Sequence, residues 1–384
     1  MKNKILTGFL LVLIGGWGSL SAQNVGSNYA RQVNTLIGTK GVGLTSGYLY
    51  PGATYPYGMV QFTPSYFSKR SGFVINQLSG GGCEHMGNFP TFPVKGKLKM
   101  SPDNILNYRI NISEEKGHAG YYEAKVQEDI HAKLTVTERT GMASYEYPAD
   151  QQYGTIIIGG GISATPIEQA AIVITAPNKC EGYAEGGNFC GLRTPYKVYF
   201  VAEFDTDALE SGTWKRNELK PNTTFAEGEY SGVYFTFDVD KKKNVQYKIG
   251  VSYVSVENAR ENLKAENTGW DFLQIQNQAE SKWNHYLGKI EVEGTNPDRT
   301  TQFYTHLYRS FIHPNVCSDV NGEYMGADFR VHKSRSKHYT SFSNWDTYRT
   351  QIQLLSILDP EVASDIVISH QLFAEEAGGA FPRW

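Results

Sequence analysis

The sequence predicts a multi-domain protein in which a β-sandwich comes first and helices follow. Over residues 27–255, short runs of alternating apolar and polar residues recur between turn signals, which favours a sandwich over a parallel α/β sheet. After residue 256 the spacing of apolar residues changes from two to the helical period. The length of 384 residues allows two domains.

The first 22 residues are predicted to be a signal peptide. Lys2 and Lys4 precede an apolar stretch over Ile5–Leu20, and small residues up to Ala22 supply a cleavage site. The apolar stretch is short and interrupted by glycines, so a retained membrane helix is not expected. The mature chain is therefore predicted to be periplasmic or secreted, with no membrane attachment after cleavage.

Residues 23–256 are predicted to form the β-sandwich domain. Turn-forming residues such as Pro221-Asn222 separate its strands. The strands are expected within 126–136, 144–147, 155–158, 196–204, 233–239 and 247–256.

Residues 257–297 are predicted to be a helical linker. A helix is expected over Glu257–Leu287, where the apolar residues from Phe272 onwards follow helical spacing, and Gly288 can end it by adopting positive φ. A short strand is expected over Lys289–Glu293.

Residues 298–384 are predicted to begin a helical domain. One helix is expected over residues 298–312, one from about Ser343 through Leu355, and one with Asp359 as N-cap and Pro360 as first residue, ending before Gly378. Three amphipathic helices in so short a stretch cannot enclose a sizeable core, so this domain is expected to be incomplete.

Composition excludes some classes of function and leaves others open. A net charge of -3 gives no basic patch for nucleic acid. The 25 Tyr, 19 Phe and 6 Trp suit either a sugar-binding cleft or a large sandwich core. None of the four cysteines lies in a CxxC pair, so a cysteine-based zinc site is not predicted. Cys180 and Cys190 flank a glycine-rich segment and either bridge it or stay unpaired.

Ser79–His85, which contains Gly80, Gly81 and Gly82, is the most permissive backbone of the first domain. Three glycines let the main chain approach a ligand closely, but they equally suit a plain turn. A nucleophile and base formed by Cys83 and His85 is rejected, because residues two apart on an extended chain have no fixed mutual geometry.

The segment Ser343–Arg349 has the strongest local signal. Asp346 falls in the first turn of a predicted helix, where a carboxylate offsets the helix dipole without any further role. Alternatively, Trp345 and Asp346 supply an aromatic wall and a hydrogen-bond acceptor for vicinal hydroxyls. Arg349, one turn further on, could then keep Asp346 ionised.

These segments together resemble glycoside hydrolase family 92, the calcium-dependent exo-acting α-mannosidases of bacteria. The resemblance runs from about Val33 to Trp384 and is most specific in Phe303–Ser310, His313-Pro314-Asn315 and Trp345–Arg349. It also rests on Val33–Thr39, Pro51–Thr63, Ser79–Pro93, Val331-His332-Lys333 and Pro382-Arg383-Trp384.

The resemblance implies a β-sandwich packed on an (α/α)6 barrel, with the mannose pocket between them. Members are inverting, so an acid and a base stand well apart on either side of a mannose-containing glycan, and calcium binds mannose hydroxyls. By match of motif, Asp346 and Trp345 would contact the sugar. The loop with Gly81, Gly82, Cys83 and Glu84 would reach over to the pocket.

This sequence departs from the family pattern in two ways. Some members specific for α-1,2 linkages carry Trp at the position aligned with Gly81, which leaves α-1,2 specificity open. The family's acid, base and calcium-binding segment follow the Pro-Arg-Trp block, so no catalytic residue and no metal ligand is predicted in this chain, and Glu375 and Glu376 receive no role.

The chain is therefore expected to be an N-terminal fragment of a mannosidase that is inactive alone and aggregates through unpaired helix faces. The alternative is a non-catalytic sugar-binding or degenerate protein. The oligomeric state is not predicted.

Overall fold

The computed structural model describes residues 28–40, 47–65, 72–103 and 111–382. The predicted signal peptide lies outside these residues. Among the described helices, none is both long and apolar enough to cross a membrane.

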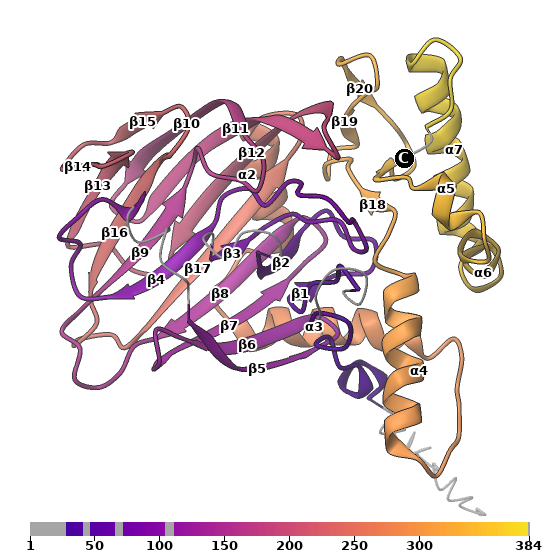
Figure 1. Cartoon of the computed structure of the whole chain (residues 1–384), viewed down its shortest axis with the longest axis horizontal. Coiled ribbons are helices and arrows are strands. Elements are labelled where there is room, and N and C mark those ends of the chain that lie inside the picture. The colour runs from indigo at the N-terminus through magenta and orange to yellow at the C-terminus, as the bar shows by residue number, and fades with distance from the viewer. Residues whose placement is uncertain (1–27, 41–46, 66–71, 104–110, 383–384) are drawn as a thin grey trace, which may run out of the picture.

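Two antiparallel sheets face each other and form the predicted β-sandwich (Figure 1). Counted over the described residues, the first sheet has eight strands, in the order β1 (Ala53–Thr54), β2 (Gln61–Pro64), β3 (Phe73–Val74), β4 (Thr91–Lys95), β9 (Tyr153–Gly159), β16 (Ser231–Asp238), β13 (Glu210–Lys215) and β14 (Glu218–Pro221). Counted in the same way, the second has nine, in the order β15 (Phe225–Glu227), β10 (Ile167–Ala176), β11 (Lys179–Phe189), β12 (Leu192–Phe204), β17 (Asn244–Ser252), β8 (Thr140–Glu146), β7 (Ile130–Val136), β6 (Tyr121–Val126) and β5 (Ile112–His118).

The sandwich core is apolar and rich in aromatic rings, as the alternation in the sequence predicts. In β6 every second residue is buried, which is the pattern of a strand with one face on a core. Phe204 packs against Phe235, Phe237 and Tyr247, with ring centroids 4.9–5.3 Å apart. Much of the aromatic content therefore serves the sandwich core.

Two helices cover the second sheet. Helix α2 (Val256–Glu266) packs on β12 and β17, and α3 (Phe272–Leu287) packs on β6, β7 and β8. The contact with α2 is close because β17 has a glycine there. A Cβ on Gly250 would lie 2.5 Å from the Ala259 carbonyl oxygen.

A second core joins the sandwich to the helical region. Helix α4 (Pro297–Ser310) packs beside α3 and the short 3-10 helix η1 (Tyr29–Gln32). The ring of Tyr57 meets Tyr286, Phe311 and Tyr339 edge-on. The Tyr57 backbone also donates to the Phe311 carbonyl and accepts from the Val316 amide, each at 2.8 Å. The chain after α4 is therefore attached to the sandwich by side chains and backbone together.

The C-terminal region consists of two short ribbons and three helices that stand beside the sandwich (Figure 1). The ribbons pair β18 (Asn315–Val316) with β21 (Tyr339–Thr340), and β19 (Glu323–Met325) with β20 (Val331–Lys333). The helices are α5 (Asn344–Thr347), α6 (Gln351–Leu358) and α7 (Pro360–Glu376). The predicted start of α7 is confirmed, because the Asp359 side chain accepts from the Val362 amide and Pro360 is its first residue.

Several predicted elements differ from the structure. The expected strand at Lys289–Glu293 is wrong: this segment has no strand partner, and the Tyr304 hydroxyl donates to the Ile290 carbonyl and accepts from the Val292 amide instead. The strand expected within 126–136 begins later, as β7 at Ile130, because Gln127 and Glu128 adopt positive φ in the turn between β6 and β7.

Two predicted helices are each divided. The helical stretch after residue 256 breaks between α2 and α3. The helix expected from Ser343 through Leu355 breaks at Thr350, whose φ is 68°. Immediately after this break, the Gln351 side chain donates to the carbonyls of Ser310 and His313. The period of apolar residues alone cannot reveal such a break.

Candidate functional site

The glycine-rich loop is closed on itself by His85. The ring Nε2 accepts from the Leu78 amide at 2.8 Å, and Nδ1 lies 2.7 Å from the Cys83 carbonyl oxygen. This geometry requires a neutral ring with its proton on Nδ1. Burial lowers the pKa of His85, which favours that neutral form. The backbone from Leu78 to His85 is therefore held in one shape.

A second histidine fastens the loop to the end of α4. The Ser79 amide donates to Nε2 of His313 at 2.7 Å, and Nδ1 of His313 donates to Oδ1 of Asn315 at 2.6 Å. Asn315 in turn donates to the Gly58 carbonyl. Burial lowers the pKa of His313 to about 4, so its ring stays a neutral acceptor.

A disulfide ties the loop to the tip of the β11–β12 hairpin. Cys83 is bonded to Cys190, so the considered bridge between Cys180 and Cys190 is wrong. The segment between those two is the extended strand β11, whose ends lie about 30 Å apart at about 3.4 Å per residue, far beyond the reach of a disulfide. Cys180 and Cys317 are buried free thiols. The rejection of Cys83 as a nucleophile is confirmed, because its sulfur is in a disulfide.

The glycines of the loop have different roles. Gly80 has a φ of +81°, and its amide donates to the Tyr48 carbonyl at 2.8 Å. A Cβ on Gly81 would lie 2.8 Å from Cε1 of His85, so a side chain there would displace the ring that closes the loop. Gly82 and Glu84 are exposed. The loop thus presents these two residues to solvent from a fixed frame.

The second predicted segment forms α5, whose first turn contains Asp346. The Ser343 hydroxyl donates to Oδ2 of Asp346 at 2.6 Å. Trp345 and Asp346 are both exposed, as a ligand contact requires. The expected pairing with Arg349 is not formed, because Nε of Arg349 donates to the Tyr348 hydroxyl instead.

Asn344 fixes the position of α5. Its Nδ2 donates to the Pro382 carbonyl at 2.7 Å, and its Oδ1 lies 3.0 Å from Nε2 of His370 in α7. Hydrogen bonds from Asn344 therefore attach the turn that carries Trp345 and Asp346 both to Pro382 and to helix α7.

Both predicted segments are anchored on the same stretch, Ser310–Asn315. The loop reaches it through Ser79 and His313. The α5–α6 segment reaches it through Gln351, whose side chain bonds the Ser310 and His313 carbonyls at 3.0 and 3.1 Å. Sequence reasoning did not predict these roles for His313 and Gln351. The only available signal was the His313-Pro314-Asn315 motif of the resemblance.

The described residues do not gather an evident calcium site. They contain one group of at least three His, Cys, Asp or Glu side chains whose ligand atoms lie within 4.8 Å of one another, namely Asp328, His332 and Glu376. Calcium takes six to eight oxygen ligands, and this group offers two carboxylates and an imidazole nitrogen. The group does not fit the calcium that the resemblance implies.

Comparison with protein families identifies the chain. The model of the glycosyl hydrolase family 92 N-terminal domain matches residues 32–252, and the model of the family 92 catalytic domain matches residues 258–384. The chain belongs to glycoside hydrolase family 92. The predicted resemblance is thereby confirmed.

Solved members of family 92 have the same arrangement of sandwich and helices. A family 92 α-mannosidase from Bacteroides thetaiotaomicron superposes with a TM-score of 0.83 at 26% identity, over 93% of this chain and 51% of its own. A family 92 inverting mannosidase from the same organism superposes with a TM-score of 0.80 at 25% identity, over 93% of this chain and 49% of its own.

One curated protein is also similar to this chain. An uncharacterized secreted glycosidase of Arthroderma benhamiae is 26% identical over 383 residues, which cover 89% of this chain and 48% of that protein. The chain thus spans about half the length of the relatives it matches.

Proposed function

We propose that this protein is the sandwich-bearing half of an inverting exo-α-mannosidase that releases mannose from glycans. Its family and its mannosidase neighbours support this activity. One neighbour has been solved with mannoimidazole bound, which supports a mannose-containing substrate. The observation that carries the proposal is the common anchoring of the glycine-rich loop and the Asp346 segment on Ser310–Asn315.

In this proposal Asp346 and Trp345 bind the sugar that is cleaved. Ser343 holds Oδ2 of Asp346, and Oδ1 has no hydrogen-bond partner among the described residues, so it can accept from a sugar hydroxyl. The exposed ring of Trp345 offers an apolar face to the pyranose. Hydrogen bonds to a charged acceptor contribute about 1.5–3 kcal/mol, so Asp346 is expected to contribute strongly to affinity.

The loop of Gly81, Gly82, Cys83 and Glu84 is proposed to border the same pocket on the sandwich side. The two histidines and the disulfide hold it in place, so a ligand need not order it on binding. Exposed Glu84 is the polar side chain that this loop offers to the rest of the glycan. The preference between α-1,2 and other linkages belongs to the same proposal and depends on what fits beside Gly81.

The acid and base of an inverting reaction are proposed to lie outside the described residues, on further helices that complete an (α/α)6 barrel. The exposed apolar residues of α6 and α7, such as Ile357 at 77% and Val367 at 64%, support this, because such faces normally pack against neighbours. A mannosidase with a signal peptide would act in the periplasm or outside the cell, and the relative from Arthroderma benhamiae is described as secreted.

Calcium is part of the proposal on the strength of the family resemblance alone. Its ligands are proposed to lie with the acid and base, since the described carboxylates and imidazoles do not gather a set that suits it. When bound, calcium would grip mannose hydroxyls and favour ring distortion. The residues described here would orient the same sugar from the other side.

The proposal is tested on the full-length product of the gene that encodes this chain, by following its reaction with α-linked mannobioses by proton NMR. An inverting exo-enzyme releases β-mannose first, before mutarotation. Asp346→Asn is expected to reduce kcat/KM by roughly 10- to 100-fold, because one charged hydrogen-bond acceptor is lost. Asp207→Asn, in an exposed turn of the sandwich, is the matched control and should leave the rate unchanged.

Two results would contradict the proposal. Release of α-mannose first would show a retaining reaction. The second contradicting result has three parts: mannoimidazole binds, the Asp346→Asn substitution weakens that binding, and no mannose is released from any linkage. The protein would then be a non-catalytic sugar-binding relative.

A further inference from the structure

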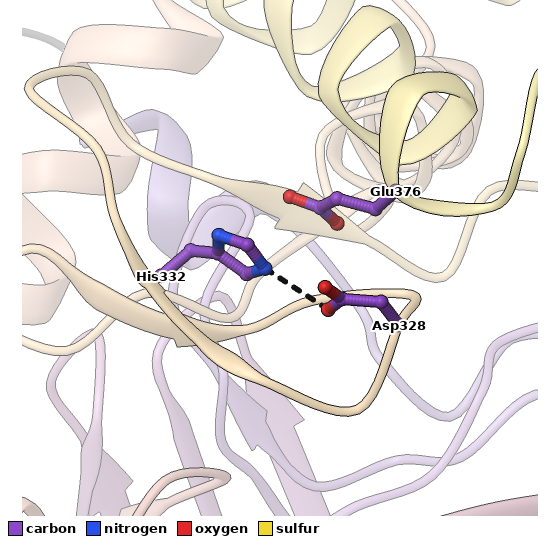
Figure 2. A group of neighbouring side chains, drawn as sticks. All are labelled: Asp328, His332 and Glu376. Carbon is purple, nitrogen blue, oxygen red and sulfur yellow. Dashed lines mark hydrogen bonds and ion pairs between the residues drawn. The ribbon is translucent and has the colours of Figure 1, made fainter.

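We propose that Asp328, His332 and Glu376 form a binding site for a borderline divalent cation of the zinc class. The three come from two elements that only the fold brings together. Asp328 and His332 lie on the β19–β20 hairpin, and Glu376 is the last residue of α7. Their ligand atoms all lie within 4.8 Å of one another, and Figure 2 shows the three side chains converging.

Each of the three side chains is held by further groups, as metal ligands usually are. Nε2 of His332 lies 2.9 Å from Oδ1 of Asp328, and the ring stacks on Tyr324 with centroids 5.7 Å apart. Oδ1 of Asp328 also accepts from the Arg330 amide. The two oxygens of Glu376 accept from the Tyr324 hydroxyl at 2.7 Å and the Ala327 amide at 2.9 Å.

Gly326 leaves room for this convergence. A Cβ at this position would lie 2.6 Å from Cδ2 of His332, 2.8 Å from Oδ1 of Asp328 and 2.8 Å from Oε2 of Glu376. All three side chains therefore close over the bare Cα of one glycine. The three side chains enclose a small space above Gly326, called the cradle below, which the side chain of any other residue at position 326 would fill.

The charges at the cradle favour a cation. Two carboxylates face one imidazole, and Glu376 lies at the C-terminal end of α7, where the helix dipole disfavours a negative charge. A divalent cation would offset both negative charges and the negative end of the helix.

The donor set selects the metal. One imidazole nitrogen with two carboxylate oxygens suits zinc, with water in the remaining position, better than calcium, which prefers oxygen alone. The His332–Asp328 hydrogen bond would be replaced by bonds from both groups to the ion. The role would be structural, because the ion would bridge the hairpin and the end of α7.

The test is isothermal titration of chelator-treated protein with zinc chloride, paired with thermal unfolding. The wild type should bind one equivalent with a Kd of about 10 μM or tighter and gain several degrees in Tm, because a ligand that binds only the folded state stabilises it. His332→Gln and Glu376→Gln should each weaken this binding by at least tenfold. Glu375→Gln, the exposed neighbour on the same helix turn, should leave it unchanged.

Asp328→Asn serves as a milder variant if the others unfold, with circular dichroism of the zinc-free proteins as the check. The proposal is overturned if zinc binds equally well to all variants, since the ion would then sit elsewhere. It is also overturned if zinc gives no stabilisation, or if calcium chloride binds as tightly as zinc. None of these readouts depends on mannosidase activity.

Discussion

The sandwich and the C-terminal helices bury their apolar residues to very different extents. In β9, three consecutive isoleucines, 156, 157 and 158, are fully buried. In α6, an equally apolar helix, Leu355 is buried but Ile357 is 77% exposed. The sandwich therefore buries its apolar side chains within its own core, whereas α6 and α7 leave many of theirs exposed.

The exposed helices are nevertheless held in place. Leu355 and Ile366 belong to the second core, with α3 and α4. Lys289 adds a hydrogen bond to the Leu358 carbonyl and lies 3.5 Å from a carboxylate oxygen of Asp359. Helices α6 and α7 are therefore positioned by their contacts with the second core, and they have no core of their own. Mutations should accordingly change the free energy of unfolding more in the sandwich than on the exposed faces of α6 and α7.

The largest expected effect is that of emptying the sandwich core. Phe235→Ala removes a fully buried ring that packs on Phe204, and should lower the free energy of unfolding by about 3–5 kcal/mol. Ile357→Ala, on the exposed face of α6, should change it by less than about 0.5 kcal/mol. Urea unfolding followed by tryptophan fluorescence measures both. Equal effects would mean that the exposed face of α6 is covered in solution.

Local signals predicted elements well where they depend on neighbouring residues. The cap at Asp359 follows from capping chemistry alone. Helix α3 ends before Gly288 as predicted, but Gly288 has a φ of -73° and so does not form the left-handed cap expected of a glycine. The bond from Cys83 to Cys190 spans 107 residues and depends on where the β11–β12 hairpin tip folds back, so no local pattern could predict it. The same holds for His313 under the loop and for Glu376 beside His332, which come together only in the tertiary structure.

The disulfide is expected to have the next largest effect. Replacing Cys83 and Cys190 together by serine should cost about 2–4 kcal/mol, because the bond closes a long loop in the unfolded chain. The effect should appear in the sandwich transition and as faster proteolysis near Gly82.

Alkylation with mass spectrometry provides the control for this pairing. Without reduction, the unfolded protein should be labelled at Cys180 and Cys317 only, and the folded protein at neither, because both thiols are buried. Labelling of Cys83 in unreduced protein would contradict the pairing.

A pH titration tests the histidine that joins the two regions. His313 has a pKa of about 4 in the folded protein and an ordinary value of 6.5 when unfolded. Between these values the unfolded chain binds more protons, so stability should fall as the pH drops from about 6.5 towards 4, by at most about 3 kcal/mol for this group. His313→Asn should remove this part of the pH dependence, measured by urea unfolding at several pH values.

His338 provides a matched control, because burial lowers its pKa to about 4 as well. His338→Asn should reduce the pH dependence to a similar degree. Only His313→Asn should also increase hydrogen exchange at the Ser79 amide, because this amide donates its hydrogen bond to Nε2 of His313. Equal protection of that amide in both variants would show that His313 does not hold the loop.

The smallest effect is expected where α3 is joined to the sandwich by charge. Glu280 is buried in this contact. Desolvation opposes its ionisation, but hydrogen bonds from His118, Arg31 and Gln276 lower its pKa to about 2. Because the folded pKa is depressed, this stabilisation is present above about pH 4.5 and is lost as the pH falls towards 2.

Glu280→Gln should therefore destabilise the protein by about 1–2 kcal/mol at pH 7 and by much less at pH 3, where fewer carboxylates are ionised. The comparison of unfolding midpoints at the two pH values measures this difference. Glu291→Gln, in an exposed contact with Tyr29, is a suitable control. A loss for Glu280→Gln that is the same at both pH values would show that packing, and not charge, joins α3 to the sandwich.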